Sequence, residues 1–463
     1  MKNKILATLA ATFAALAVQA QAPALSTFAV GPTTVTVSAL TPNLDTVWEL
    51  LWGPDNFLWM TERYGRISRV NPATGAVLPV LTLPDVTENN ESGLLGMVLH
   101  PDFATSPYVY VVYNYTDAGA LKEKLVRYTY AAATNSLTAP FVLLGNIVAT
   151  TNHSGSRLCI LADRTLLMTT GDALQASEAQ NRASLNGKIL RLNLDGTIPA
   201  NNPTPGSRIY TLGHRNPQGL VQLANGRIYS SEHGPSTNDE LNRIEPGRNY
   251  GWPNVEGYCD LPNEQVFCAA NNVREPLTTW TPTIAPAGLT YYNHPAIPGW
   301  RGSLLLSVLR GSKLVQLPLD ATGNIITTRT DFLTTYGRLR SVCVSPQGRV
   351  YVGTSNRDGR GTPVATDDRI LVLENRAYTP TATHPAALPG VELWPNPAHH
   401  TATLRLPAGP AQVQLRDALG RVVRAFTAYH QETVLLLEGL TPGVYAVQIM
   451  AATGTATRQL VVE

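Results

Sequence analysis

The sequence of 463 residues has few charged side chains, 15% of the total, and almost no excess of either sign, with 35 Lys and Arg against 33 Asp and Glu. Lys2 and Lys4 lie in the first 20 residues, which contain no acidic residue, so the rest of the chain carries no net formal charge. A nucleic-acid groove or a polybasic membrane patch needs a local excess of basic residues. The charge balance therefore argues against both kinds of partner.

Several catalytic signatures are also missing. The sequence contains no G-x-S-x-G elbow, no Walker loop, no G-x-G-x-x-G and no H-E-x-x-H motif. These motifs mark serine hydrolases, nucleotide-binding proteins and zinc proteases. Their absence lowers the case for all three classes.

Long apolar runs are missing after the N-terminus. Residues 1–20 have a basic start, a short apolar run and the small-residue pattern Val18-Gln19-Ala20. This is the pattern of a secretory signal peptide and not of a membrane span. We expect cleavage after Ala20 and a mature protein, without a transmembrane segment, that leaves the cytoplasm.

Cysteine is scarce, with four residues in the chain. Cys259 and Cys268 flank the loop CDLPNEQVFC, and we predict that they form a disulfide in an oxidising compartment. Cys159 and Cys343 lie in apolar runs that resemble strands, which favours buried thiols.

Helical periodicity is nearly absent, whereas one strand pattern recurs. Each copy is a polar turn, then alternating apolar residues, then a loop rich in glycine or asparagine, as in a β-hairpin. The clear copies are GPDNFLWMTERYGRISRV, LADRTLLMTTGD, LANGRIYSSEHG and SPQGRVYVGTSNRDGRG, and HPDFATSPYVYVVYNY and IPGWRGSLLLSVLRG fit more loosely.

About six such units between roughly residues 40 and 376 predict an all-β fold, a six-bladed β-propeller, over residues 21–377. The alternative is an array of β-sandwiches, which would not need recurring loops on one face. In a propeller the loops of all blades converge at one end of a central channel, so residues distant in sequence can meet there.

The composition changes after the propeller. Residues 378–390 form a linker rich in Pro, Thr and Ala. Strand alternation resumes over residues 391–463, which predicts a small C-terminal β-sandwich domain. It carries no cluster of catalytic side chains, so we interpret it as a handle and not as an active site.

Polar side chains concentrate in a few loops of the predicted propeller. NHSGSRL supplies His153, and GHRNPQGL supplies Arg215, Asn216 and Gln218 on one stiff turn. In SEHGPSTNDELN, the Gly234-Pro235 turn lies beside Glu232, Asp239 and Glu240 and could seat Ca²⁺ through oxygen ligands. Taken singly, each stretch is equally compatible with a solvated loop.

Arginines add to this set. Arg338 and Arg340 alternate along a predicted strand, so both side chains leave the same face. Two like charges side by side are unfavourable unless an anion lies between them. Together with Arg310 and His153, they indicate a site for an anionic cofactor held by arginine and metal, with histidine as proton acceptor. Arginines on a solvated edge remain the alternative.

At these residues the chain resembles the soluble pyrroloquinoline quinone (PQQ)-dependent sugar dehydrogenases, the glucose/sorbosone dehydrogenase family of six-bladed propellers. The likeness covers about residues 40–376. It is carried by ESGLLGMVLHPDF, NHSGSRL, TTGD, NGKILRLNLDG, GHRNPQGL, SEHGPSTNDELN, NYGWPN, WTPTIAPAGL, and SNRDGRG followed by DDRI.

The resemblance implies oxidation of an aldose at its anomeric carbon to a lactone, with hydride transfer to PQQ. His153 would be the general base, and Arg215 would polarise the quinone. The carbonyls of Gly234 and Pro235 would hold Ca²⁺. The remaining roles it implies are cofactor contacts for Asn216, Thr283, Arg310, Arg338 and Arg340, and a sugar pocket lined by Glu91, Asn152 and Gln218.

Three positions depart from the family pattern. Arg310 stands where the family usually has lysine, which keeps the charge in a bulkier, forked group. Asn152 and Glu91 replace an acid and an amide of the glucose-oxidising branch, so the sequence leaves the identity of the sugar open, as it does the external electron acceptor.

The tail resembles the C-terminal sorting domain of the type IX secretion system of Bacteroidetes, on WPNPA, LRDALGRVV, LTPGVYAVQI and the closing RQLVVE. This implies passage through the periplasm, then export by that machinery to the cell surface or medium. Two other functions remain open for the propeller: a non-catalytic module that binds glycans or a protein, and a metal-dependent sugar lactonase.

Overall fold

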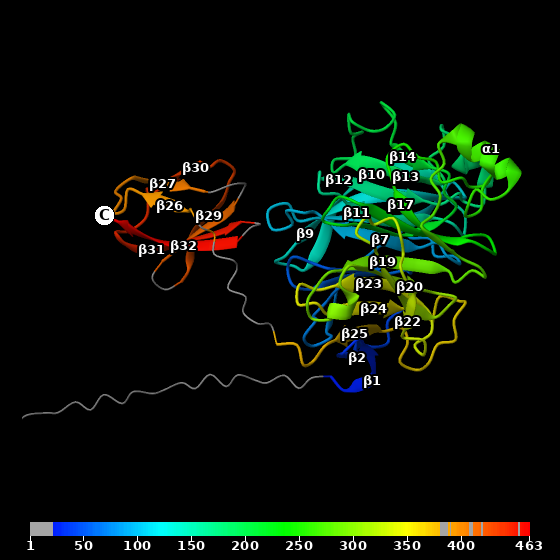
Figure 1. Ribbon diagram of the computed structural model, residues 1–463, viewed down its shortest axis with the longest axis horizontal. Coiled ribbons are helices and arrows are strands. Elements are labelled where there is room, and N and C mark those ends of the chain that lie inside the picture. Colours follow the sequence, from blue (N-terminus) through cyan, green and yellow to red (C-terminus); the bar gives the residue numbers. More distant parts are fainter. Residues whose placement is uncertain (1–21, 380–387, 389, 407–410, 418–419, 452–453) are drawn as a thin grey trace, which may run out of the picture. The chain divides into compact units, whose positions relative to one another are not determined.

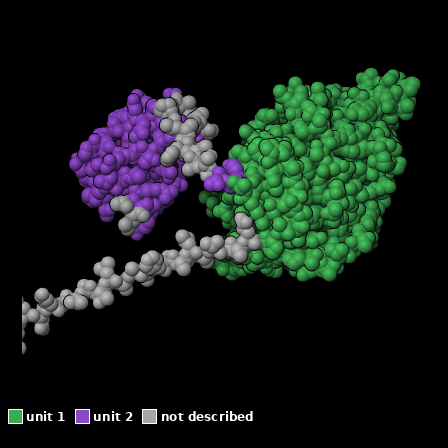
Figure 2. Space-filling model, turned by 60° about the horizontal axis from the view of Figure 1, so that its bottom comes forward, with its two compact units in different colours: residues 1–377 green, residues 378–463 purple. Residues whose placement is uncertain are grey.

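The structure is a computed structural model that describes residues 22–379, 388, 390–406, 411–417, 420–451 and 454–463. The expected signal peptide, residues 1–20, and most of the expected linker, residues 378–390, lie outside the described residues. The chain divides into two compact units, residues 1–377 and residues 378–463 (Figure 2).

The first unit consists of six antiparallel sheets, which we call blades 1 to 6. Blade 1 contains β3 (Val47–Trp52), β4 (Leu58–Glu62), β5 (Arg66–Val70) and β6 (Val77–Thr82). Blade 2 contains β7 (Leu94–Leu99), β8 (Tyr108–Asp117), β9 (Ala120–Ala131) and β10 (Ser136–Val148). Blade 3 contains β11 (Gly155–Ile160), β12 (Thr165–Thr170), β13 (Lys188–Asn193) and β14 (Ile209–Leu212).

The other three blades follow the same order. Blade 4 contains β15 (Pro217–Gln222), β16 (Ile228–Glu232), β17 (Asp239–Ile244) and β18 (Thr278–Trp280). Blade 5 contains β19 (Pro286–Tyr292), β20 (Ser303–Val308), β21 (Lys313–Pro318) and β22 (Thr330–Phe332). Blade 6 contains β23 (Leu339–Val344), β24 (Val350–Thr354) and β25 (Ile370–Glu374), joined by β2 (Thr33–Thr41) and β1 (Ala24–Val30).

The first strands of the blades form a closed circle. Strand β3 contacts β7, and the series continues through β11, β15, β19 and β23, which contacts β3 again. The last blade is completed from the start of the chain, because β2 pairs with β25 (Figure 1, blue against yellow-orange). The sequence prediction of a six-bladed β-propeller is therefore confirmed.

The pairing of the first two strands decides where functional loops meet. The six recurring stretches of the sequence contain β4, β8, β12, β16, β20 and β24, the second strand of each blade. Because the strands are antiparallel, the start of a first strand faces the end of a second strand, as in Gly155 opposite Thr170 and Pro217 opposite Glu232. Loops before first strands and after second strands therefore gather at one end of the propeller.

Apolar side chains fill the space between neighbouring blades. Trp59 of β4 is fully buried, with its ring centre 5.6 Å from that of Phe103 and 5.1 Å from that of Tyr130. Val109 and Val111 of β8 belong to the same cluster, so strands of blades 1 and 2 share one core. Such close packing holds the blades, and hence their loops, at fixed distances.

The single α-helix among the described residues lies between β17 and β18. It is α1 (Pro262–Asn271), and short 3₁₀ helices occur at Ala176–Ala179 and Pro298–Trp300. Within the described part of the chain, no helix is long and apolar enough to cross a membrane.

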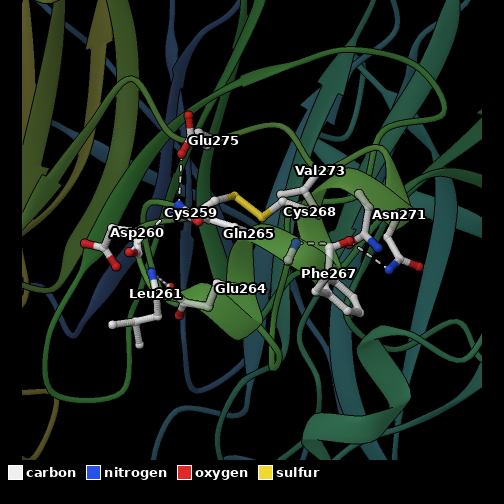
Figure 3. Close-up of a disulfide and its surroundings, with 12 residues drawn as sticks. Cys259, Asp260, Leu261, Glu264, Gln265, Phe267, Cys268, Asn271, Val273 and Glu275 are labelled. Atoms are coloured by element: carbon white, nitrogen blue, oxygen red, sulfur yellow. Dashed lines mark hydrogen bonds between the residues drawn. A yellow bond between two sulfur atoms is a disulfide. The ribbon is translucent and has the colours of Figure 1, made fainter.

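A disulfide ties α1 to the residues that precede it, because Cys268 lies within the helix and Cys259 lies before it. Cys259 and Cys268 are bonded, as the sequence predicts, and the Cys259 N–H donates to the Glu275 carboxylate at 2.8 Å (Figure 3). Cys159 and Cys343 are free thiols on β11 and β23. Cys343 is buried as expected, whereas Cys159 is only half-buried.

The second unit contains two sheets. One is formed by β26 (Glu392–Trp394), β27 (Thr401–Arg405) and β30 (Glu432–Leu436). The other is formed by β28 (Ala411–Arg416), β29 (Val422–Ala428), β31 (Gly443–Ala451) and β32 (Gly454–Val462). Leu404, Val413 and Ile449 come from both sheets and share one buried core, which confirms the predicted β-sandwich.

Candidate active site

A cavity of about 350 Å³ lies among the loops at one end of the propeller. A narrower cavity of about 60 Å³ adjoins it, since Glu91, His233 and Arg338 line both. Of the residues singled out from the sequence, the larger cavity is lined by Glu91, His153, Arg215, Gly234, Pro235, Asp239, Thr283, Arg310 and Arg338. Gln218 and Arg340 line the narrower cavity, and Asn152 and Asn216 are not among the lining residues of either.

His153 is held by a carboxylate from the neighbouring strand end. Its Nδ1 lies 2.7 Å from Oδ1 of Asp172, and the exposed fractions of the two side chains are 12% and 2%. His153 precedes β11 by two residues and Asp172 follows β12 by two, so the strand pairing brings them together. Because a carboxylate accepts hydrogen bonds, Nδ1 carries the proton of the neutral ring and Nε2 keeps a lone pair.

The backbone around His153 is adapted to this position. His153 has φ of 59°, and its N–H donates to Oε2 of Glu91 at 3.3 Å. A Cβ at Gly171 would lie 1.7 Å from the carbonyl oxygen of His153, so only glycine permits the two loops to approach this closely. The imidazole is therefore fixed from both its ring and its backbone.

Arg215 lies on a turn that is fixed by a buried carboxylate. The Glu232 side chain accepts hydrogen bonds from the Arg215 N–H and from Nδ1 of His214, the latter at 2.9 Å. His214 is fully buried and stacks on Tyr250 with ring centres 4.7 Å apart. His214 thus has a structural role, which explains part of the polar cluster in GHRNPQGL.

The guanidinium of Arg215 reaches the cavity. Its Nη1 donates to the His233 carbonyl at 3.2 Å, and its Cζ lies 5.4 Å from the ring centre of Trp252. Burial lowers the pKa of Arg215, and the charges of Asp172 and Glu232 oppose this effect. Arginine remains charged even so, so Arg215 presents a fixed cation.

The turn at Gly234 and Pro235 offers backbone oxygens. The carbonyl oxygens of both residues accept no hydrogen bond from any described residue. A Cβ at Gly234 would lie 2.0 Å from the Thr237 carbonyl oxygen, so the tight turn requires glycine. Free carbonyl oxygens are suitable ligands for a hard cation such as Ca²⁺.

The acidic residues beside this turn are already engaged. Asp239 accepts the Gly234 N–H at 2.8 Å and, through its other oxygen, the Ala285 N–H at 2.8 Å. Burial raises the pKa of Asp239, and these N–H groups oppose the rise. Glu240 accepts the Gly257 N–H at 3.0 Å. The carboxylates therefore orient the loops, and the oxygens left for a cation are the backbone carbonyls.

Arg338 and Arg340 do share one anion, and it is the carboxylate of Asp358 in the same chain. Oδ2 of Asp358 accepts Nε of Arg338 at 2.8 Å and Nη2 of Arg340 at 3.3 Å. Burial alone would raise the pKa of Asp358, but the guanidinium groups of Arg340 and Arg338 outweigh this effect and hold the pKa below its usual range. The like-charge repulsion expected from the sequence is thus relieved internally.

Asp358 also joins these arginines to the rim of the cavity. Its Oδ1 accepts the Arg360 N–H at 3.0 Å, and its carbonyl oxygen accepts Nη1 of Arg63 at 3.4 Å. Nη1 of Arg360 lies 3.3 Å from Oε1 of Glu91, and Nη2 donates to Oδ1 of Asn152 at 3.4 Å. With its side chain 51% exposed, Arg360 holds Glu91 and Asn152 at the mouth of the cavity.

Arg310 and Thr283 form a pair on the opposite rim, where Nη1 of Arg310 donates to Oγ1 of Thr283 at 2.8 Å. Asn216 is fully buried, and its Oδ1 accepts the Gly155 N–H at 3.1 Å. Gln218 accepts Nη1 of Arg340 at 3.4 Å. Nε2 of Gln218 also donates to Oδ1 of Asn216 at 3.4 Å, so the two amides connect the start of β11 to Arg340.

Sequence reasoning missed several residues of the site: Arg63, Asp172, His233, Asp358 and Arg360. Three of them carried a signal, because Asp172 ends TTGD opposite NHSGSRL, and Asp358 and Arg360 lie within SNRDGRG. His233 lies next to Gly234-Pro235. Burial lowers the pKa of His233, and its neutral Nε2–H donates to the Pro286 carbonyl at 2.9 Å.

The chemistry of the site follows from these groups. A neutral imidazole with a free lone pair can take a proton from an alcohol. Fixed guanidinium groups can bind a polycarboxylate, and backbone oxygens can hold a hard cation beside it. The cavity thus suits proton abstraction next to a bound, negatively charged group.

Comparisons with known proteins agree with this arrangement. The family model described as Glucose / Sorbosone dehydrogenase matches residues 44–366. The model described as Secretion system C-terminal sorting domain matches residues 392–463.

Individual relatives give the same picture. The chain is 34% identical to quinoprotein glucose dehydrogenase B of Acinetobacter calcoaceticus over 396 residues, which cover 66% of this chain and 82% of that protein. It is 31% identical to aldose sugar dehydrogenase YliI of Escherichia coli, covering 71% and 92%. The PQQ-bound aldose sugar dehydrogenase of Streptomyces coelicolor has a similar structure, with a TM-score of 0.65, 35% identity, and coverage of 74% and 99%.

The shared carboxylate of Asp358 gives a testable prediction. Replacing Asp358 by Asn leaves two nearly buried guanidinium groups without their counter-charge, and breaking such a pair costs roughly 3–5 kcal/mol. We expect Asp358→Asn to lower the free energy of unfolding in urea by about this amount. The control Asp102→Asn, which removes the exposed pair with Arg164, should have little effect.

Citrate provides the second arm of this test, because it offers three carboxylates to the freed arginines. It should raise the melting temperature of Asp358→Asn more than that of the wild type. An equal rise in both proteins would show that Asp358 does not neutralise Arg338 and Arg340.

Proposed function

The chain belongs to the glucose/sorbosone dehydrogenase family of sugar dehydrogenases, and from this premise we propose that it is a secreted PQQ- and Ca²⁺-dependent dehydrogenase. It oxidises aldose sugars at the anomeric carbon to lactones and passes the electrons to an external acceptor. The observation that carries this proposal is the convergence of His153, Arg215 and Arg338 on one cavity.

The residues of the cavity fit the cofactor. Arg215 lines the larger cavity, and its buried Nε has no hydrogen-bond partner among the described residues, which suits a polar group that meets a ligand. Among its guanidinium nitrogens, Arg338 uses Nε for Asp358, so its Nη groups can bind a carboxylate. The carbonyls of Gly234 and Pro235 would hold Ca²⁺, and Asn216 and Thr283 would contact the ring system.

The charges also fit. PQQ carries three carboxylates, for which Arg310, Arg338 and Arg340 would be the partners. Burial lowers the pKa of Arg340 to about 10, so it stays protonated at neutral pH. When bound, PQQ supplies a quinone that accepts the hydride of the anomeric carbon, and Ca²⁺ supplies a Lewis acid that polarises it.

In this reaction His153 would act as general base. Asp172 keeps the proton on Nδ1, so Nε2 would take the proton of the anomeric hydroxyl as that carbon loses its hydride. Arg215 would donate to a quinone oxygen and stabilise its developing negative charge. Glu91, Asn152 and Gln218 would bind sugar hydroxyls and orient the anomeric carbon.

The two alternative functions fit the cavity less well. A metal-dependent lactonase would need carboxylates that are free to bind a metal. The two carboxylates that line the larger cavity are engaged, because Asp239 accepts backbone N–H groups and Glu91 pairs with Arg360. A purely binding propeller would not need the paired His153 and Asp172. Both observations favour the dehydrogenase.

The match of residues 392–463 to a secretion sorting domain supports a location outside the cytoplasm. We propose that the protein reaches the periplasm by its signal peptide and is then carried by the type IX machinery to the cell surface or medium. Residues 21–377 would be the catalytic domain, and residues 378–390 the connection to the sorting domain.

The function is tested by adding PQQ and Ca²⁺ to cofactor-free protein, then a panel of aldoses with an artificial electron acceptor. We expect dye reduction that depends on PQQ and is lost when Ca²⁺ is chelated. His153→Gln should still bind PQQ but turn over roughly 10²- to 10⁴-fold more slowly, the usual contribution of a general base. Undiminished turnover of His153→Gln would exclude His153 as the base.

Export is tested separately. In a bacterium with the type IX system, a protein that lacks residues 391–463 should accumulate in the periplasm. A periplasmic reporter fused to residues 391–463 should appear on the cell surface or in the medium, as measured by cell fractionation. Retention of the fusion in the periplasm would refute the proposed role of the tail.

A further inference from the structure

Trp252 belongs to NYGWPN, a stretch that has no role in the function described so far. It lies in the segment between β17 and β18, yet its side chain reaches loops that precede other strands. Its Nε1–H donates to Oδ2 of Asp172 at 2.9 Å, and Cζ of Arg215 lies 5.4 Å from its ring centre. One side chain thus contacts both the partner of His153 and the cation of the cavity.

We propose that Trp252 is a positioning residue for sugar oxidation, which fixes the protonation pattern of His153 through Asp172 and supports Arg215 with its ring. The proposal rests on the roles given above to His153 and Arg215. Trp252 does not line the larger cavity, and the adjoining pocket that it lines together with Arg215 has a volume of only about 10 Å³. The role proposed for Trp252 therefore runs through its contacts to Asp172 and Arg215.

The hydrogen bonds of Asp172 are divided between its two oxygens. Oδ1 receives Nδ1 of His153 at 2.7 Å and the Leu174 N–H at 2.9 Å, whereas Oδ2 receives the indole of Trp252. Rotation of the carboxylate would break these bonds together. Since Asp172 is almost fully buried, an oxygen without a donor would also be costly.

The consequence concerns the choice between two forms of a neutral imidazole. A carboxylate held in place beside Nδ1 selects the form with the proton on Nδ1. Nε2 then keeps the lone pair that a general base needs. If Asp172 could turn freely, both forms would be populated and part of the protein would lack a base at Nε2.

The ring of Trp252 acts on Arg215 in a different way. A guanidinium beside an aromatic face is stabilised without a hydrogen bond and without a further carboxylate. The donors of Arg215 therefore stay available to the cavity, apart from Nη1, which binds the His233 carbonyl. The Asp172 N–H donates to the Arg215 carbonyl oxygen at 2.8 Å, so the two loops are also joined directly.

The backbone of Trp252 is itself fixed. Its N–H donates to the Gly213 carbonyl at 3.1 Å, and its carbonyl oxygen accepts Nε2 of Gln180 at 2.6 Å. Gln180 and Asn249 are joined by two hydrogen bonds between their side-chain amides, of 3.0 and 2.8 Å. Trp252 therefore stands on a rigid support that links the loops of blades 3 and 4.

Trp252→Phe tests the proposal, because it keeps an aromatic side chain and removes the donor to Asp172, together with part of the ring volume. Trp300→Phe is a matched control, since Trp300 is fully buried and its Nε1 has no hydrogen-bond partner among the described residues. His153 is one of nine histidines, so its nitrogen signals are assigned by their loss in His153→Gln.

The first measurement is ¹⁵N NMR of histidine-labelled protein without PQQ, and it needs no catalysis. Wild type and Trp300→Phe should show His153 with a protonated Nδ1 and an unprotonated Nε2. Trp252→Phe should show both forms in exchange, and Asp172→Asn should show the same or a larger change. An unchanged His153 signal in Trp252→Phe would overturn the proposal, whether or not the protein proves to oxidise sugars.

The second measurement uses protein loaded with PQQ and Ca²⁺. In Trp252→Phe, kcat should fall by about 10- to 100-fold, as expected for a misplaced catalytic group, with KM for the sugar nearly unchanged. Trp300→Phe should retain the wild-type kcat. A rise in KM with an unchanged kcat would contradict a positioning role. Absence of turnover in the wild type would contradict the proposed function only.

Discussion

In each blade the first strand begins opposite the end of the second, because the two strands pair antiparallel. This pairing is the constraint on which the site depends. It places every loop before a first strand and after a second strand at one end of the propeller. The contact between β23 and β3 closes the circle of blades. It brings together loops that are far apart in sequence, such as those that contain Arg63 and Asp358.

Charge is scarce in this chain, yet several charged side chains from separate blades meet at the cavity. Several buried charges there have a partner: Asp172 contacts His153, and Asp358 pairs with Arg338 and Arg340. The guanidinium of Arg215 has no carboxylate partner among the described residues, and Glu232 fixes its turn through the backbone N–H. Internal counter-ions let several cations lie close together in a folded protein. Because Asp358 pairs with Arg338 and Arg340, neither arginine is left without a counter-charge when no ligand is bound. An anionic ligand would share these two arginines with Asp358.

The fold could be predicted from the sequence because its signal is local. Each second strand has its own polar turn, its own alternation of apolar and polar residues and its own loop, and six copies of this pattern predict a propeller. The candidate loops could be located for the same reason. The ion pairs could not, because Asp358 and Gln218 meet Arg340 only through sheet pairing and blade packing. Composition also does not reveal that Asp239 is engaged by the N–H groups of Gly234 and Ala285, which leaves the backbone carbonyls of Gly234 and Pro235 as the oxygens available to a cation.

The central claim is that arginines from separate blades bind one polycarboxylated quinone. It is tested most directly by calorimetric titration of PQQ, with Ca²⁺, into cofactor-free wild type and Arg338→Gln. Hydrogen bonds to charged groups contribute about 1.5–3 kcal/mol each, so the dissociation constant should rise by roughly 10- to 150-fold in the variant. Wild-type affinity should also fall as salt is added. Equal affinity of the two proteins, or no binding to the wild type, would contradict the account.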